Sequence, residues 1–175
     1  MNDDDGSIPL QLLVIVVLTL LNAFFAASEI AILSVNDARM KKLAEDGNKK
    51  AKNLLLFLNN SSKMLSTIQV GVTFSGFLAS AVASDFFSER LADFVNKQFS
   101  WGDAYAGVVR TVSMAVITIL LSYFTLVFGE LVPKRIAMKK SEKLALHSTG
   151  ILRFTSVLFS PFVKILTLSV NGILR

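Results

Sequence analysis

Residues 8–33 read IPLQLLVIVVLTLLNAFFAASEIAIL, a run that is almost entirely apolar. A helix needs about 20 such residues to cross a bilayer, and this run is longer. We therefore expect a first transmembrane helix over about residues 8–34. A cleaved signal peptide is the competing interpretation, but residues 3–5 are acidic where a signal peptide is basic, and the apolar run is too long for one.

Two further apolar runs have the length of a membrane span, at about residues 63–84 and 108–132. The first of them is rich in small and hydroxyl-bearing side chains, and residues 59–62, Asn-Asn-Ser-Ser, predict a polar turn that caps its start. The second carries a carboxylate, Glu130, near its end. We expect both runs to be transmembrane helices.

The remaining segments are predicted to lie along the membrane. Residues 139–175 are apolar but contain Arg153 and Lys164, and Pro161 interrupts them, which suits short amphipathic helices in the interface. Residues 36–58 have a similar amphipathic pattern with many lysines. The sequence thus predicts an all-α membrane protein, with three transmembrane helices plus amphipathic juxtamembrane helices, forming one transmembrane domain over residues 1–175.

The distribution of charge predicts the orientation. The chain has 18 basic and 13 acidic residues, and the basic ones lie beside the apolar runs, which favours a membrane surface over nucleic acid as the partner. Residues 36–63 hold seven basic and three acidic residues, residues 134–143 hold five and one, and residues 85–110 hold three and four. By the positive-inside rule, we expect a multi-pass protein of the plasma membrane with its N-terminus outside and its C-terminus cytosolic.

Residue types exclude several kinds of chemistry. The chain has no cysteine and a single histidine, His147, so thiolate zinc sites, iron–sulfur clusters and cysteine nucleophiles are excluded. Phosphate-loop, zinc-protease and serine-hydrolase motifs are absent from the sequence. We therefore expect neither a self-contained ATPase nor a protease, and no enzyme.

Two carboxylates lie within the apolar runs, Glu29 in the first and Glu130 in the third. At 1.5 Å per residue, they lie roughly 12 Å and 6 Å from the predicted cytosolic helix ends, and Gln69 and Thr73 of the second run lie at similar depth. Charges at such depth are costly and are usually functional, so the grouping predicts a cation site open to the cytosol. The alternative is that each carboxylate reaches water or pairs with a nearby lysine.

A backbone carbonyl available to bind an ion is predicted in the segment Gly129-Glu130-Leu131-Val132-Pro133-Lys134. Pro133 has no N–H, so the Gly129 carbonyl, four residues earlier, loses its helical donor and must find another partner or bind an ion. A carboxylate, a carbonyl and hydroxyls suit Mg²⁺, Ca²⁺ or Na⁺. The alternative is that Pro133 merely ends the helix at the interface.

Small residues recur every four positions in the second run, which allows helix backbones to approach closely. We expect them to serve mainly in helix packing. The two rows are Ser75, Ala79 and Ala83, and Gly76, Ser80 and Ser84.

Three motifs, in order along the chain, resemble the transmembrane domain of the CNNM/CorC magnesium transporters, also called hemolysin-like proteins. They are NAFFAASEIAIL at 22–33, TIQVGVT at 67–73 and LVFGELVPKRIA at 126–137. The resemblance implies a homodimer and Na⁺-coupled Mg²⁺ efflux, with a dehydrated Mg²⁺ bound between the helices in an inward-facing state. It also implies an ATP-binding pair of cytosolic CBS domains downstream, which this chain does not include.

Many members of that family have Phe-Ser-x-Ser-Glu in the first motif and Gly-Asn in the second, whereas this chain has Ala26 and Val72-Thr73 at those places. The expected ligands of Mg²⁺ are Ser28, Glu29, Thr73, Gly129 and Glu130, and Asn22, Gln69, Gly71 and Pro133 are expected to support the site. Two alternatives remain: a non-transporting membrane anchor and dimerisation domain for a cytosolic regulatory module, and a lytic protein, which no secretion signal supports.

Overall fold

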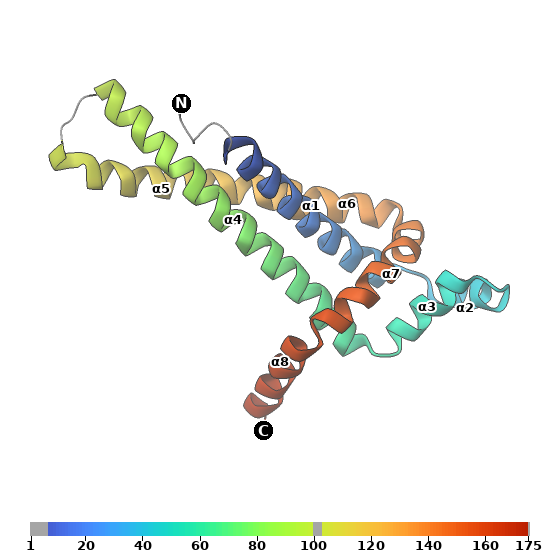
Figure 1. Ribbon diagram of the computed structural model, residues 1–175. Coiled ribbons are helices and arrows are strands. Elements are labelled where there is room, and N and C mark those ends of the chain that lie inside the picture. Colours follow the sequence, from blue (N-terminus) through green and yellow to red (C-terminus); the bar gives the residue numbers. More distant parts are fainter. Residues whose placement is uncertain (1–6, 100–102, 175) are drawn as a thin grey trace.

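The computed structural model describes residues 7–99 and 103–174, and the regular structure of this part of the chain is entirely helical (Figure 1). The elements are α1 (Ser7–Leu33), α2 (Asp37–Glu45), α3 (Lys49–Leu58), α4 (Ser61–Phe99), α5 (Asp103–Leu126), the π-helical turn η1 (Val127–Leu131), α6 (Val132–Lys139), α7 (Ser141–Leu158) and α8 (Ser160–Ile173).

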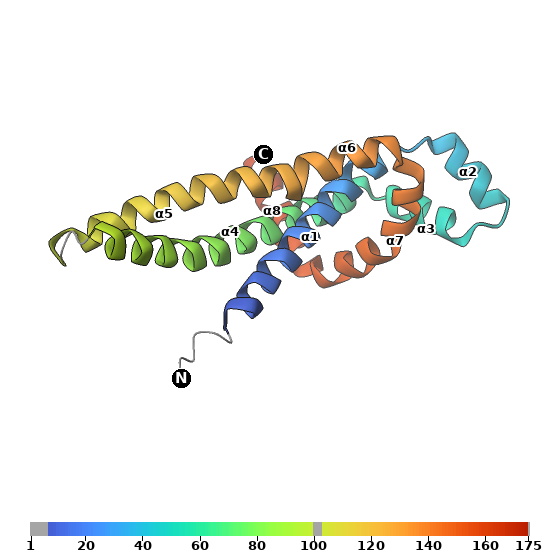
Figure 2. The ribbon, with the colours of Figure 1, turned by 90° about the horizontal axis from the view of Figure 1, so that it is seen from above.

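Three helical stretches are long and apolar enough to cross a membrane: Ile8–Leu33, Ser61–Val95 and Gly107–Lys139. The expected all-α membrane fold with three candidate spans is therefore confirmed. The helices α4 and α5 run antiparallel along one another, and α1 packs against α4 on one side and against η1 and α6 on the other (Figures 1 and 2).

Two helices continue past the predicted ends of their spans. The helix α4 reaches Phe99, well beyond residue 84, because the polar sequence after that point still favours a helix. The third stretch does not stop at Val132: α5, η1 and α6 follow one another without a break, past Pro133 to Lys139. The apolar run marks the part of each helix suited to lipid, and the helix itself is longer.

The flanking segments each form two helices. The segment expected at 36–58 is divided by a turn in which Gly47 has a φ of 91°, a conformation that favours glycine. The segment expected at 139–175 is divided between α7 and α8, whose axes differ by 73°. The predicted polar cap before α4 is present, because the Asn60 side chain accepts a hydrogen bond from the Lys63 N–H at 3.3 Å.

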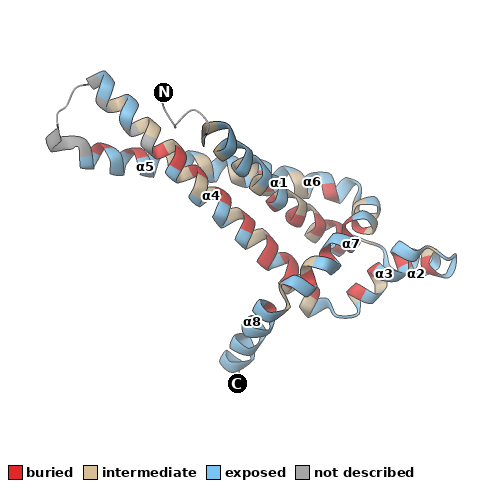
Figure 3. Ribbon diagram, in the orientation of Figure 1, coloured by how far each residue is buried: buried red, intermediate tan, exposed pale blue. Residues whose placement is uncertain are grey.

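Buried residues gather at one end of the bundle, where α1 meets α4, α6 and α7 (Figure 3). Phe25, Ile32, Met40, Leu54 and Leu152 belong to this core. Along the rest of α1 and α5 many large apolar side chains are exposed, among them Leu13, Leu20 and Ile119. Such surfaces are expected of helices that face lipid. The core therefore fixes the helices at the end of the bundle that carries most of the basic residues.

Candidate cation-binding site

A cavity of about 290 Å³ lies between α1, α4 and the helix formed by α5 and η1. Its polar lining comes from all three elements. Asn22 belongs to α1, Thr73 and Ser80 to α4, and Ser122, Thr125 and Glu130 to α5 and η1. The cavity thus brings together side-chain oxygens from three helices that are far apart in the sequence.

Asn22 lies between α4 and η1 beside this cavity. Its side chain is buried, and its Oδ1 accepts a hydrogen bond of 3.4 Å from the Ser75 hydroxyl of α4. On the other side, a methyl group added at Gly129 would lie 2.8 Å from Asn22 Nδ2, closer than side chains pack. Any larger residue at position 129 would have to displace the Asn22 amide, so glycine favours the close approach of η1 to α1.

The approach of α1 to α4 depends on a second glycine. A methyl group added at Gly71 would lie 2.6 Å from the ring of Phe25, which is buried in the core. Ser75, Ala79 and Ala83 are buried, whereas Gly76 and Ser80 of the second row line the cavity. The row of Ser75, Ala79 and Ala83 therefore packs against neighbouring helices, as predicted. In the other row, Gly76 and Ser80 instead leave space that forms part of the cavity.

The π-helical turn places Glu130 at the cavity. In η1 the N–H of Val132 bonds to the Val127 carbonyl, five residues earlier. A spacing of five would match the Gly129 carbonyl with the N–H of Lys134 instead of the missing one of Pro133. Pro133 does not end the helix here, because it lies in the first turn of α6 and α6 continues to Lys139. The Gly129 carbonyl as an ion ligand stays a prediction.

A lysine lies between the two predicted carboxylates. The Lys134 ammonium is 2.8 Å from Glu130 Oε1 and 3.1 Å from Glu29 Oε2. The three side chains are one quarter to one third exposed, so water screens the contact only in part. Two carboxylates and one ammonium leave one net negative charge beside the cavity. Among the residues that the structure describes, no group of three His, Cys, Asp or Glu side chains converges.

The other expected site residues have different surroundings. The Ser28 hydroxyl is buried and donates to the Phe24 carbonyl at 2.7 Å, and it is not part of the cavity lining. Gln69 is exposed and donates to Thr73 at 3.4 Å. The structure thus brings Asn22, Thr73 and Glu130 to one cavity and joins Glu29 to Glu130 through Lys134.

The predicted alternative, in which each carboxylate pairs with a nearby lysine, is what the structure shows, with Lys134 as that lysine. The sequence analysis did not name Lys134 as this partner, and it missed Ser122 and Thr125. Lys134 follows Glu130 by four residues, the spacing at which side chains on a helix face one another. That signal identifies the pair only if the helix is known to continue through Pro133. Ser122 and Thr125 lie in an apolar helix, where nothing in the sequence separates a hydroxyl facing a cavity from one bonded to its own backbone.

Comparison with protein families bears directly on this arrangement. The family described as the CNNM, or Cyclin M, transmembrane N-terminal domain matches residues 13–175. The chain belongs to the CNNM transmembrane-domain family. The predicted family is thus confirmed, and its three motifs supply Asn22, Thr73 and Glu130 of the cavity.

Several curated proteins resemble this CNNM domain. UPF0053 protein sll0260 from Synechocystis is 37% identical over 170 residues, 97% of this chain and 37% of that protein. UPF0053 protein YhdT from Bacillus subtilis is 36% identical over 89% of this chain and 33% of its own. A protein of Haemophilus influenzae named polyamine export protein is 27% identical over 87% of this chain and 34% of its own. The chain spans about a third of the length of these relatives.

Proposed function

We propose that this CNNM domain transports cations, with Mg²⁺ as the cargo, leaving the cell in exchange for Na⁺. The observation that carries the proposal is the cavity between three helices, which contains Glu130 and has one net negative charge beside it. An intramembrane charge of this kind marks an ion pathway by default. The resemblance of its three motifs to the magnesium transporters supports Mg²⁺ as the cargo.

The proposed ligands are oxygen atoms, as Mg²⁺ requires. Glu130 supplies the charge, Thr73 a hydroxyl and Gly129 its carbonyl, with Ser28 and Glu29 completing the set after a rearrangement near α1. Lys134 offsets one of the two negative charges while no cargo is bound. A divalent cation entering the cavity takes over that role, and the Lys134 ammonium then moves toward water.

A second candidate cargo is a polyamine, and the Lys134 contact favours it. Glu29 and Glu130 already hold a primary ammonium at 3.1 and 2.8 Å, which is the group that a polyamine presents. The relative from Haemophilus influenzae is named for polyamine export. A cavity of about 290 Å³ is large enough for one end of such a chain and for a hydrated metal ion.

The proposal includes the surroundings of the domain. The domain lies in the plasma membrane as a homodimer, with its N-terminus outside, and cytosolic CBS domains follow it in the full-length protein. The basic segments at 36–63 and 134–143 support this orientation. A membrane anchor that transports nothing is the alternative in which the same fold serves only a cytosolic module.

The experiment is a flux assay in liposomes that contain the purified protein. Mg²⁺ efflux is followed with and without a Na⁺ gradient, and spermidine efflux is followed in parallel. Glu130→Gln keeps the size of the side chain and removes its charge, so it is expected to abolish flux. Glu142→Gln is the matched control, because Glu142 pairs with Arg39 at 3.2 Å, away from the cavity.

Each result separates the candidates. Na⁺-dependent Mg²⁺ flux that only Glu130→Gln abolishes supports the first proposal, and the same pattern with spermidine supports the second. If neither cation is transported, the result supports the alternative, a membrane anchor that transports nothing. Flux that Glu130→Gln does not change means that the cavity is not the pathway.

A further inference from the structure

A second cavity lies where α4 begins, and its wall is mostly apolar. Its volume is about 450 Å³, and its lining comes from the start of α4 and from α8. Two lysines, Lys63 and Lys164, belong to the lining together with the hydroxyls of Ser62 and Ser160. Among the residues that line it there is no carboxylate. The charged side chains in its wall are thus both cationic, and we call it the cationic cavity.

A smaller cavity of about 250 Å³ shares part of this lining. It includes Asn60 and Lys63 and adds Arg153 from α7, whose guanidinium donates to Asn53 Oδ1 at 3.0 Å. The residues that line this cavity also include no carboxylate. Three cationic side chains from three helices thus surround the start of α4.

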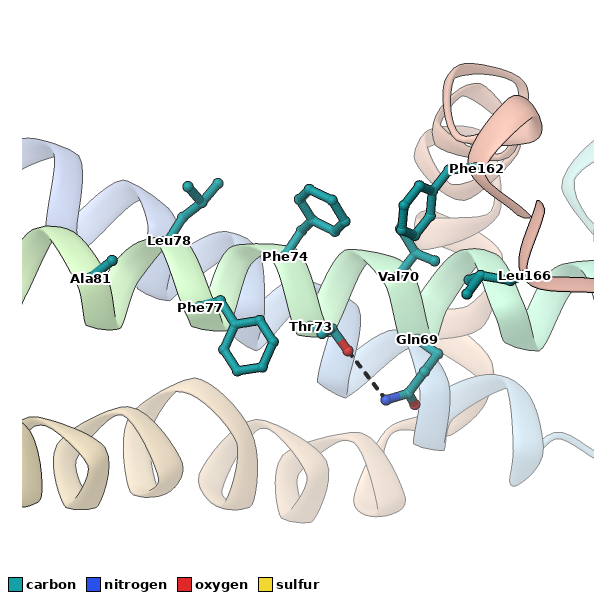
Figure 4. A pocket seen from close by; sticks show the side chains of 9 residues that line it. All are labelled: Gln69, Val70, Thr73, Phe74, Phe77, Leu78, Ala81, Phe162 and Leu166. Carbon is teal, nitrogen blue, oxygen red and sulfur yellow. Dashed lines mark hydrogen bonds between the residues drawn. The ribbon is translucent and has the colours of Figure 1, made fainter. Parts of the chain in front are cut away.

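Aromatic contacts fix α8 beside α4. The ring of Phe74 stacks on that of Phe159 at 6.5 Å and meets that of Phe162 edge-on at 5.3 Å. Next to these rings an apolar cavity of about 590 Å³ lies between α4 and α8, and Figure 4 shows Phe162 and Leu166 of α8 facing Phe74 and Val70 of α4 across it. One side of α8 is therefore apolar, and Lys164 lies toward the cationic cavity.

The cationic cavity and the smaller cavity that shares part of its lining lie at the level expected of a membrane interface. Lys63 lies at the start of the candidate span Ser61–Val95, where a helix passes from headgroups into hydrocarbon. The helix α8 is mostly apolar, with Lys164 as its one charged residue, and exposes Ile165, Leu168 and Ile173, so it is suited to lie at the same level with its lysine reaching the headgroups. The positive-inside rule assigns this level to the cytosolic leaflet.

We propose that the cationic cavity binds the headgroup of an anionic phospholipid of that leaflet. The phosphate lies between the Lys63 and Lys164 ammonium groups, and the hydroxyls of Ser62 and Ser160 donate to it. Val163 and Leu168, which also line the cavity, contact the first part of the acyl chains. A neutral lipid would leave the two lysines without a counter-charge. A free phosphate would leave the apolar part of the lining without a partner.

This lipid site is separate from the cation pathway. The two cavities share no lining residue, so a lipid can bind whether or not cargo is present. Its structural effect is to hold α8 against the start of α4. The proposal therefore stands or falls independently of the transport assay.

The experiment is native mass spectrometry of the purified full chain titrated with phosphatidylglycerol or phosphatidylcholine. Each basic residue near a membrane surface contributes about fivefold to the affinity for anionic lipid, so Lys63→Gln/Lys164→Gln is expected to weaken phosphatidylglycerol binding roughly 25-fold. Lys41→Gln/Lys50→Gln, which removes the same charge from exposed positions of α2 and α3 outside the cavity lining, is the control and is expected to lose much less affinity, because neither lysine contacts the bound headgroup.

Three results would overturn the proposal. They are an equal loss in the control variant, equally tight binding of phosphatidylcholine, and full competition by soluble glycerol phosphate, which would indicate a phosphate site without a lipid. Because a variant could lose binding through misfolding, a second experiment uses the unmutated protein. Phosphatidylglycerol with a photoreactive group near its phosphate is expected to label residues 160–168, and labelling elsewhere alone contradicts the site.

Discussion

The backbone of Gly129 lies so close to the amide of Asn22 that a methyl group at Gly129 would be 2.8 Å from Nδ2. Asn22 is buried and also bonds to Ser75 on its other side, so it has little freedom to move away. This contact sets the distance between α1 and η1.

Replacing Gly129 by Ala is expected to destabilise the protein by about 1–3 kcal/mol, because the added methyl group overpacks the helix contact. Gly76→Ala is the control: a methyl group there would lie 3.6 Å from Asn22 Oδ1, an ordinary contact. Both changes gain helix propensity, so the difference between them isolates the clash. Thermal unfolding in detergent measures it, and equal melting temperatures would show that Asn22 yields easily.

Replacing Lys134 by Met is expected to make stability depend on an added cation. Without the ammonium, Glu29 and Glu130 lose their shared partner, at a cost of about 1–3 kcal/mol. Added Mg²⁺ or spermidine then restores the melting temperature more strongly than in the parent, because binding to the folded state stabilises it. Arg135→Met, at the exposed neighbouring position, is expected to show no such dependence.

Adjacent residues of α4 are expected to respond differently to the same substitution. Ala79 is 1% exposed, so Ala79→Leu overpacks the interior and costs about 1–3 kcal/mol. Ser80 lines the cavity, so Ser80→Leu fills space there and lowers cation flux more than stability. Melting temperature and flux are measured for both variants. A larger loss of stability in Ser80→Leu would show that the cavity is closed by packing.

The absence of cysteine from the sequence allows a direct test of topology. Gly172→Cys at the end of α8 and Lys50→Cys in α3 are expected to react with a membrane-impermeant maleimide only after the cells are permeabilised. Val108→Cys, at an exposed position near the start of α5, is expected to react in intact cells. Labelling of Gly172→Cys in intact cells would mean that α7 and α8 together cross the membrane.

The long apolar runs predicted the membrane fold correctly, because hydropathy reports which helical segments suit lipid. It does not report where a helix ends. After residue 84 the sequence becomes polar, yet α4 continues, and the Arg90 guanidinium bonds to the Phe86 carbonyl at 3.0 Å and lies over the Phe86 ring. Pro161 correctly suggested a break between α7 and α8 but not its angle of 73°. It also gave no sign that Phe74 of α4 contacts Phe159 and Phe162 at that break.

Depth along each helix correctly suggested that Glu29 and Glu130 lie near one another, since both were counted from the same membrane surface. Depth gives no information on the rotation of a helix about its axis. For that reason the sequence did not show that Thr73 faces the cavity whereas the Ser28 hydroxyl bonds to the Phe24 carbonyl. The loss of a donor at Pro133 was visible, but the π-helical turn beside it was not.

The π-helical turn also absorbs one residue of chain length. A π-turn holds about one residue more than the 3.6 of an α-turn, so deleting one residue from Val127–Leu131 can restore α-helical winding while α6 keeps about its present rotation. Lys134 would then stay on the side of Glu29. A one-residue deletion from the regular helix α5 has no such outlet: it turns everything that follows by about 100° and moves Lys134 away from Glu29, so it is expected to be the more damaging change.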